Sequence, residues 1–357
     1  VILNKLNNPS GAVKAYKKAI SLRPDSAEFH NNIGLAYVKL GELGLAKKGF
    51  ESAIGNNPKI AEIFNNYGNA LLENGEIDAA RDSFLRAIQI DSSFIDALWN
   101  LSGTVTTIDE HISLLEDCLQ IDQGYKKAKL MLSSMKAYLG DPGELNTVLE
   151  TSLRNHPYIR SASWLIDLKN RPAVYFNRWQ FYDSVSKLSQ PSRPFYEFGV
   201  WRGSSFRYLI KIYKQGYGFD TFQGIPEDWD DLEKGSYSSD GAIPSVEGGT
   251  FIAGEFDKTL PTFFSKERPK ASLINIDSDL YSSAKSVLVH ARRIIDEFTV
   301  IVFDQFLMNE HWENDEKRAL EEFCAEENMG YEVIAVSLFT KQVAVKLSKL
   351  AVRQDSA

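Results

Sequence analysis

The feature that most constrains this chain is an internal repeat of 34 residues at its N-terminal end. Small, aromatic and proline positions recur at this spacing, pairing Ala12 with Ala46, Tyr16 with Phe50, Ala19 with Ala53 and Pro24 with Pro58. Within each unit, apolar residues recur at helical spacing, and a glycine-containing turn such as 39–42 or 73–76 separates two such runs. Each unit is therefore predicted to be a helical hairpin. One hairpin cannot bury its apolar face without stacked neighbours, so the repeats should form an array.

The next copy keeps the period, with Gly34, Ala46, Phe50 and Ala53 mapping onto Gly68, Ala80, Phe84 and Ala87. These residues resemble the tetratricopeptide repeat, which implies an all-α helical repeat domain. Two further units are degenerate, with Cys118 and Ser152 at the second small position, and one is about three residues short. We predict a repeat domain over residues 1–157. Because Val1 falls partway through a unit, we expect this domain to be truncated at its N-terminus, with more repeats upstream.

Three asparagines also follow the period. Asn32, Asn66 and Asn100 lie 34 residues apart on the first helix of successive units, which lines the groove of such arrays. A ladder of amides could clasp the backbone of an extended protein or peptide partner. The alternative is that these asparagines only bond to neighbouring turns.

Composition narrows the classes of partner and compartment. The formal net charge of -8 argues against a surface that binds nucleic acid or an anionic membrane. The two cysteines, Cys118 and Cys324, are too far apart in sequence to suggest a disulfide framework or a zinc site. No long apolar run or signal peptide is present, so we expect a cytoplasmic protein.

Beyond the repeats the pattern changes. Residues 158–194 are predicted to form a helical linker, with helices over 164–169 and 175–188. From residue 195 to 350, seven short apolar runs alternate with helical segments, which predicts a mostly parallel sheet covered on both faces. The last two strands are separated by too few residues for a crossover, so they should form an antiparallel hairpin. In such a fold, ligands bind at the carboxyl ends of the strands.

The first predicted strand runs through Glu197 into a turn with Gly199 and Gly203, and a helix starts at Ser204. Such a turn lets backbone approach a ligand, and the helix N-terminus offers N–H groups to an anion. Asp220 ends the second strand, where a carboxylate can accept the hydroxyls of a ribose. Alternatively, Asp220 caps the turn that follows it.

Four ordered blocks carry a resemblance: Gly-Val-Trp-Arg-Gly at 199–203, Gly-Phe-Asp-Thr-Phe-Gln-Gly-Ile-Pro-Glu at 218–227, Ile-Asp-Ser-Asp-Leu-Tyr-Ser-Ser at 276–283 and Phe-Asp-Gln-Phe at 303–306. They resemble the macrocin O-methyltransferase (TylF-like) family, whose members are class I methyltransferases with a Rossmann-like fold that use S-adenosylmethionine. The resemblance implies that Glu197, Gly199, Gly203 and Ser204 surround the methionine part of the cofactor. It also implies that Asp220 holds the ribose, and that Gly254 and Phe256 border the adenine.

The same resemblance implies a magnesium site at Asp277, Asp304 and Gln305, with Asp277 also a candidate base. Family members usually carry a second aspartate where this chain has Gln305. Losing one negative charge should weaken the site, so metal dependence stays open. The alternative for these aspartates, and for Asp279, is that they cap helices or turns.

Two further features belong to the catalytic half. His311 is the one histidine that follows a strand end there, where it is either a general base or a solvated loop residue. The long acidic stretch 223–249, with Trp229 and Tyr237 as its aromatic members, is predicted to be a substrate lid.

Together these features predict an S-adenosylmethionine-dependent O-methyltransferase that acts on a hydroxyl of a small molecule, sugar or glycoconjugate, with repeats that bind a protein partner. The rival hypothesis is a non-catalytic scaffold in which the second half keeps only the fold.

Overall fold

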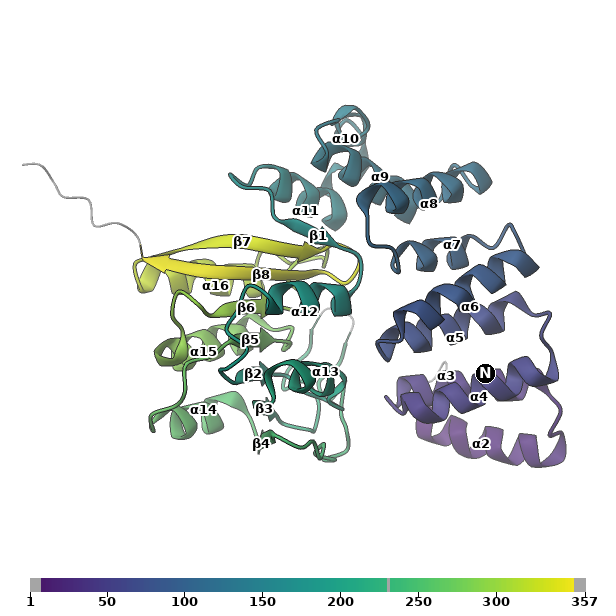
Figure 1. The fold of residues 1–357 in the computed structure, drawn as a ribbon, viewed down its shortest axis with the longest axis horizontal. Helices are drawn as coiled ribbons and strands as arrows, with labels where there is room; N and C mark the ends of the chain where they lie inside the picture. The colour runs from purple at the N-terminus through teal and green to yellow at the C-terminus, as the bar shows by residue number, and fades with distance from the viewer. Residues whose placement is uncertain (1–7, 230–231, 350–357) are drawn as a thin grey trace, which may run out of the picture. The chain divides into compact units, whose positions relative to one another are not determined.

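The computed structural model describes residues 8–229 and 232–349. The chain divides into two compact units, Val1–Met135 and Lys136–Ala357 (Figure 1). The first seven residues of the predicted repeat domain, two residues of the predicted lid and the last residue of the predicted 195–350 domain lie outside the described ranges.

The first unit consists of paired helices. They are α2 (Pro9–Leu22), α3 (Ala27–Lys39), α4 (Leu43–Asn56), α5 (Ala61–Glu73), α6 (Ile77–Ile90), α7 (Ile95–Ser102), α8 (Ile108–Ile121) and α9 (Lys126–Tyr138). Helices α3, α5 and α7 begin 34 residues apart, whereas α9 begins 31 residues after α7, which confirms one unit about three residues short. The predicted turns are also present, with Gly41 and Gly75 at φ of 66° and 79°, a conformation that favours glycine.

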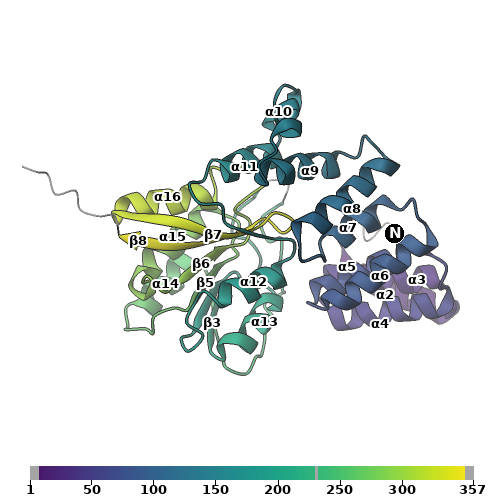
Figure 2. The same cartoon turned by 45° about the horizontal axis from the view of Figure 1, so that its top comes forward.

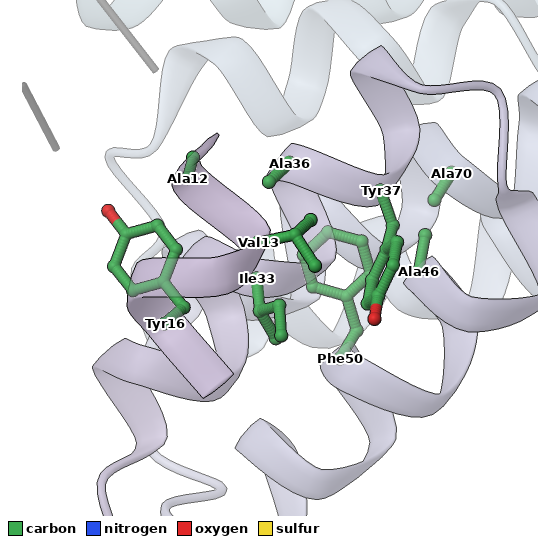
Figure 3. Packing of buried hydrophobic residues seen from close by; sticks show 9 residues of the cluster. All are labelled: Ala12, Val13, Tyr16, Ile33, Ala36, Tyr37, Ala46, Phe50 and Ala70. Atoms are coloured by element: carbon green, nitrogen blue, oxygen red, sulfur yellow. The ribbon is translucent and has the colours of Figure 1, made fainter. Parts of the chain in front are cut away.

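Helix packing explains the repeat signature. A Cβ atom on Gly34 would lie 2.9 Å from the ring of Phe50, and one on Gly68 would lie 2.5 Å from the ring of Phe84. The aromatic side chain of each second helix therefore packs directly on the glycine of the first. Figure 3 shows Phe50 in its cluster beside Ile33, Ala36 and Tyr37. Ala36 and Ala46 are fully buried, because only small side chains fit where the helices meet.

The second unit begins with helices and continues as an α/β domain. Its elements are α10 (Gly143–Leu149), the 3₁₀ helix η1 (Ser152–Asn155), α11 (Pro157–Ile166), β1 (Ala173–Tyr175), α12 (Arg178–Ser186), β2 (Phe195–Phe198), α13 (Ser204–Tyr213), β3 (Gly216–Asp220), β4 (Gly249–Ala253), α14 (Phe256–Phe264), β5 (Leu273–Ile276), α15 (Tyr281–Ala291), the 3₁₀ helix η2 (Arg292–Ile294), β6 (Val300–Phe303), α16 (Glu316–Glu326), β7 (Met329–Ser337) and β8 (Gln342–Lys349).

These strands form one sheet in the order β1-β7-β8-β6-β5-β2-β3-β4. All neighbours are parallel except β8, which is antiparallel to both β6 and β7. In Figures 1 and 2, α12 and α13 lie on one face of the sheet, and α14, α15 and α16 lie on the other. The predicted fold class, a mostly parallel sheet with a C-terminal antiparallel hairpin, is confirmed.

The sheet has one strand more than the seven predicted. The extra strand, β1, pairs in parallel with β7 at the sheet edge and lies within the predicted linker. Its Ala-Val-Tyr sequence includes β-branched and aromatic residues that suit a strand. Asn177 then accepts a hydrogen bond from the backbone N–H of Gln180, so the helix predicted from residue 175 begins at Arg178.

Helix α11, also from the predicted linker, packs on the loop after β6. Arg160 pairs with Glu313, with 2.8 Å between Nε and Oε1, and Ser161 Oγ accepts a hydrogen bond from the Met308 N–H at 2.9 Å. The Trp164 ring lies 5.7 Å from the rings of both Phe306 and Trp312. This helix therefore fixes the loop that carries the candidate residues beyond Asp304.

Candidate active site

Strand register aligns the candidate residues. Phe198 of β2, Ile276 of β5 and Phe303 of β6 are successive partners at the carboxyl ends of neighbouring strands. Gly199, Asp277 and Asp304 follow these residues directly, so they lie side by side at one edge of the sheet. The structure thus brings together the glycine turn and the two aspartates that the sequence singled out.

The turn between β2 and α13 depends on its glycines. Gly199 has a φ of 92°, and a Cβ atom there would lie 1.7 Å from the backbone oxygen of Asp277. No side chain fits such an approach, so the ends of β2 and β5 meet this closely only at a glycine. Gly203, at a φ of 77°, is the N-cap of α13 and provides no side-chain cap. The backbone N–H groups of the first helical turn, which starts at Ser204, thus lack a capping side chain.

Asp220 orders this turn from the neighbouring strand. Its Oδ2 accepts hydrogen bonds from the N–H groups of Val200 and Trp201 at 2.7 and 2.6 Å, and its Oδ1 accepts one from Phe222 at 2.6 Å. A carboxylate has about four acceptor positions, so three are used within the protein. Only the bond from Phe222 caps the turn that follows Asp220, and the other two order the glycine turn, so room remains for about one further donor.

Gly254 lies next to Asp220. Its N–H donates to the Asp220 backbone oxygen at 2.9 Å and its φ is 136°, so the end of β4 is tied to the end of β3. Phe256 begins α14, a helix that the sequence analysis missed, and its ring meets that of Phe198 edge-on at 5.9 Å. The two predicted adenine neighbours are thus close to the turn and to Asp220.

Glu197 is a buried carboxylate in the centre of the sheet. Its Oε1 accepts a hydrogen bond from Asn275 Nδ2 at 2.9 Å across the β2–β5 pair, and Oε2 has no hydrogen-bond partner among the described residues. Burial raises the pKa of Glu197 to about 8, and hydrogen bonds from Ser205 and Asn275 offset only part of this rise. A fully buried carboxylate with an unpaired oxygen is costly, which makes it a candidate for a functional role.

A chain of buried hydrogen bonds links Glu197 to Asp304. Tyr182 Oη donates to Asn275 Oδ1 at 3.1 Å, and Gln342 Nε2 lies 3.3 Å from Tyr182 Oη and 2.6 Å from Asp304 Oδ1. The residues of this chain come from α12 and from strands β2, β5 and β8. Each amide points its nitrogen toward a carboxyl group and its oxygen toward a hydroxyl.

Arg178 supplies a positive charge to the same cluster. Its Nη2 lies 3.4 Å from Asp304 Oδ2, and the Asp304 side chain is only 2% exposed. Arg178 and Tyr182 are four residues apart on α12, so they share one face of that helix. Arg178, Tyr182, Asn275 and Gln342 are not among the residues predicted from the sequence. The four-residue spacing of Arg178 and Tyr182 is a signal in the sequence, but by itself it indicates only one face of a helix.

The two aspartates after β5 differ in their backbone. Asp277 is half-buried, and burial together with the charges of Asp304 and Asp279 raises its pKa well above the ordinary value. Asp279 is buried at a φ of 61°, and burial raises its pKa to about 7. No described residue donates a hydrogen bond to the Asp277 carboxylate, so this side chain stays available to a ligand.

Position 305 does not complete a metal site here. The Gln305 N–H donates to Oε2 of the buried Glu316 at 3.2 Å, and its side-chain carbonyl oxygen lies 3.5 Å from Asn309 Nδ2. Across residues 8–229 and 232–349, no group of three or more histidines, cysteines, aspartates and glutamates has an arrangement that could hold a metal ion. The structure thus gives the predicted magnesium site no support.

His311 lies apart from this cluster. It is exposed, in the segment between β6 and α16, and its backbone oxygen accepts a hydrogen bond from Asn314. No contact within the described part of the chain connects its imidazole to Asp277 or Asp304, so its predicted role as a base gains no support.

The predicted lid approaches the cluster through an aromatic residue. Trp201, at a φ of 48°, donates its indole N–H to the backbone oxygen of Ser238 at 3.3 Å, and its ring meets that of Tyr237 edge-on. The pKa of Tyr237 is raised by burial and by the charges of Asp279, Asp277 and Asp304. Tyr237 therefore interacts electrostatically with all three aspartates, while half of its surface stays exposed.

The asparagines of the repeats bond to one another. Asn66 donates to Asn31 Oδ1 at 3.1 Å, and Asn100 donates to Asn65 Oδ1 at 2.9 Å. Both acceptors are buried. The amides of Asn66 and Asn100 thus tie successive repeats together, and these bonds are to helical side chains rather than to neighbouring turns. Within the described ranges, no helix has the length and apolarity needed to cross a bilayer.

Comparisons with known proteins identify both regions of the chain. A family model described as a TPR repeat matches residues 2–41, one described as a tetratricopeptide repeat matches residues 33–93, and one described as a methyltransferase domain matches residues 196–306. The specific resemblance to macrocin O-methyltransferases stays a prediction. None of the curated proteins matches the chain.

Among solved structures, the chain is similar to MamA, with 22% identity over 45% of this chain and 91% of that chain and a TM-score of 0.37. It is also similar to YrrB, a TPR protein, with 20% identity over 46% of this chain and 88% of that chain and a TM-score of 0.38. A third is PilF of Pseudomonas aeruginosa, with 19% identity over 42% and 71% and a TM-score of 0.38. From the family models, the chain carries tetratricopeptide repeats followed by a methyltransferase domain.

Proposed function

We propose that this protein is an S-adenosylmethionine-dependent O-methyltransferase whose acceptor is a hydroxyl of a small molecule, a sugar or a glycoconjugate. The observation that carries the proposal is the glycine turn after β2, which Asp220 orders and which lies beside Asp277 and Asp304 within the matched methyltransferase region.

The residues around the turn fit such a cofactor. Glu197 has an unpaired buried oxygen, α13 begins without a side-chain cap, and Asp220 can accept about one more hydrogen bond. Glu197, Gly199, Gly203 and Ser204 would hold the methionine part, and the cofactor supplies an electrophilic methyl group when bound. Asp220 would hold the ribose, with Gly254 and Phe256 beside the adenine.

On the acceptor side, Asp304 and Asp277 would have different roles. Asp304 is held by Arg178 and Gln342, so its carboxylate is fixed in place. Asp277 has no hydrogen-bond donor among the described residues, so it would take the proton of the acceptor hydroxyl as that oxygen bonds to the methyl carbon. The bond between the methyl carbon and the donor sulfur would break in the same step, with its electron pair left on sulfur and S-adenosylhomocysteine as the leaving group. Placing the oxygen in line with the methyl donor is the other requirement, and the edge formed by β2, β5 and β6 provides the fixed frame.

For the repeats, we propose binding of a protein or peptide partner through the groove lined by the first helices. Asn66 and Asn100 each use one amide N–H in bonds between repeats, so each keeps a carbonyl oxygen and a second N–H that can contact a peptide backbone. A cytoplasmic location remains part of the proposal.

Calorimetric titration of the full chain with S-adenosylmethionine tests the proposed enzyme function. We expect saturable binding, and we expect Asp220→Ala to lose most of the affinity, because both the turn and the ribose contact depend on this carboxylate. Asp82→Ala, which removes an exposed carboxylate on α6, is the control and should bind as the wild type does. Absence of binding at millimolar cofactor would support the rival hypothesis, a scaffold that has kept only the fold.

A second titration isolates the ribose contact. The wild type should bind adenosine more tightly than 2′,3′-dideoxyadenosine, and Asp220→Ala should remove that difference. An equal preference in both proteins would mean that Asp220 only orders the turn.

A further inference from the structure

The Asp304 carboxylate already has a partner on each oxygen. Oδ1 accepts a hydrogen bond from Gln342 Nε2 at 2.6 Å, and Oδ2 faces Arg178 Nη2 at 3.4 Å. Both donors are fixed by the fold, because Gln342 begins β8 and Arg178 begins α12. Two of the roughly four acceptor positions of this carboxylate are therefore used, and a metal ion bound to Asp304 would lie close to the Arg178 guanidinium.

The charges of the predicted ligand set also argue against a bound divalent cation. With Gln305 in place of an acid, two carboxylates, Asp277 and Asp304, remain of the predicted ligand set, and Arg178 neutralises one of them. Hard divalent cations need several oxygen ligands, and a nearby guanidinium repels them. These residues do not fit a resident divalent cation.

The charge of Arg178 also reaches the carboxylates around Asp304. Asp277 follows β5 beside Asp304 after β6, so the guanidinium that pairs with Asp304 lies at the same strand ends as Asp277. The Arg178 side chain is 22% exposed whereas that of Asp304 is 2% exposed, so the guanidinium is the more accessible member of the pair.

We propose that Arg178 is the resident cation of the acceptor side, in the place that a divalent metal ion would otherwise take, and that this chain needs no bound metal. This inference rests on the proposed function. A guanidinium stays protonated at any physiological pH and presents fixed N–H donors, so it can orient an acceptor oxygen and stabilise the charge on it. Chelators do not remove it.

Titration with Mn²⁺ alone, following the free ion by electron paramagnetic resonance, tests the metal part of this proposal on the full chain. The wild type should show no saturable binding below millimolar Mn²⁺. Gln305→Asp restores an acid and should gain weak binding, and Arg178→Gln combined with Gln305→Asp should bind at least tenfold more tightly because the competing charge is gone. Stoichiometric micromolar binding by the wild type that Asp277→Asn abolishes would overturn the proposal, as would equal binding by the two Gln305→Asp proteins.

Titration with S-adenosylmethionine separates this inference from the proposed function. Excess EDTA should leave the cofactor affinity of the wild type unchanged, and Arg178→Gln should keep that affinity within about threefold. If Arg178→Gln does not fold, Arg178→Lys, which keeps the charge, serves instead and should exclude Mn²⁺ in the Gln305→Asp background. Loss of cofactor binding in EDTA would refute the metal-independent site, whereas no cofactor binding in any condition would refute the proposed function alone.

Discussion

In the first unit, Val1–Met135, the buried amides of Asn31 and Asn65 are neutral and accept hydrogen bonds from Asn66 and Asn100 of the next repeat. The sheet unit instead buries carboxylates, including Glu197, Asp304 and Glu316. Neutral amide pairs cost little to bury, whereas a carboxyl group without a full set of partners is costly to bury and, like Glu197, has a raised pKa. This difference points to the second unit as the part that holds the functional site, because costly buried ionisable groups cluster at functional sites.

The largest expected effect concerns the closest backbone approach. Gly199→Ala would force a Cβ atom to 1.7 Å from the Asp277 backbone oxygen at a positive φ, so we expect a loss of about 4 kcal/mol or more. Urea unfolding followed by tryptophan fluorescence suits this test, since five of the six tryptophans belong to the second unit.

The matched control is Gly55→Ala in α4, where an added Cβ meets no atom within 4 Å. It should stabilise the chain slightly, by roughly 0.5 kcal/mol, because alanine favours helix. Equal effects of the two substitutions would contradict the close approach of β2 and β5.

The next effect is the pH dependence of the free energy of unfolding of the second unit, which Glu197 causes. Its pKa in the folded protein is about 8, above the ordinary 4.5, so the folded state holds a proton that the unfolded state has lost between these values. Stability from this group is fully present below pH 4.5 and is lost as the pH rises to 8, by on the order of 4 kcal/mol. Glu197→Gln should remove this loss. Parallel stability curves of the two proteins from pH 5 to pH 8 would show that the buried carboxylate does not titrate there.

The repeat unit should respond to pH in the opposite sense. Burial lowers the pKa of His111 from 6.5 to about 4. Its contribution to stability is present above pH 6.5 and is lost as the pH falls to 4, by roughly 3 kcal/mol. His111→Asn should flatten the acid limb of an unfolding curve measured by circular dichroism, and replacing the exposed His311 should leave that limb as it was. Identical acid limbs for wild type and His111→Asn would contradict the prediction.

The smallest effect concerns the amide ladder. Asn100→Ala should cost about 1 kcal/mol, because it removes one hydrogen bond and leaves the buried Asn65 oxygen without its donor. A double-mutant cycle with Asn65→Ala should give a coupling energy of about that size. Asn32→Ala is the control, since no described residue bonds to its side chain, and a coupling near zero for Asn65 and Asn100 would mean that the ladder does not join the repeats.

Much of this architecture could be predicted from the sequence. Gly34 with Phe50 and Gly68 with Phe84 recur because each pair is one contact, so the repeat in the sequence is a repeat in the packing. The alternation of strands and helices correctly predicted the parallel sheet. Asp277 and Asp304, predicted to follow strand ends, lie side by side because Ile276 and Phe303 before them are partners in the sheet.

The partners of these residues could not be predicted in the same way. Arg178 lies 126 residues before Asp304 and Gln342 lies 38 residues after it, and Tyr182 joins the cluster through Gln342. No periodicity connects such positions, because their contact depends on how α12 and β8 pack on the sheet. Strand β1 was missed since three residues are too few to show an alternation, and α14 was missed because Pro261 interrupts its helical pattern.

The placement of Arg178 and Tyr182 on α12 bears on how this protein can be dissected. The matched methyltransferase region ends at residue 306 and begins at residue 196, so both residues and Gln342 fall outside it. A fragment cut at those limits would keep Asp304 but lose its counter-ion and its amide donor. An autonomous fragment with an intact cluster must therefore be sought with boundaries that take in α12 on one side and β8 on the other.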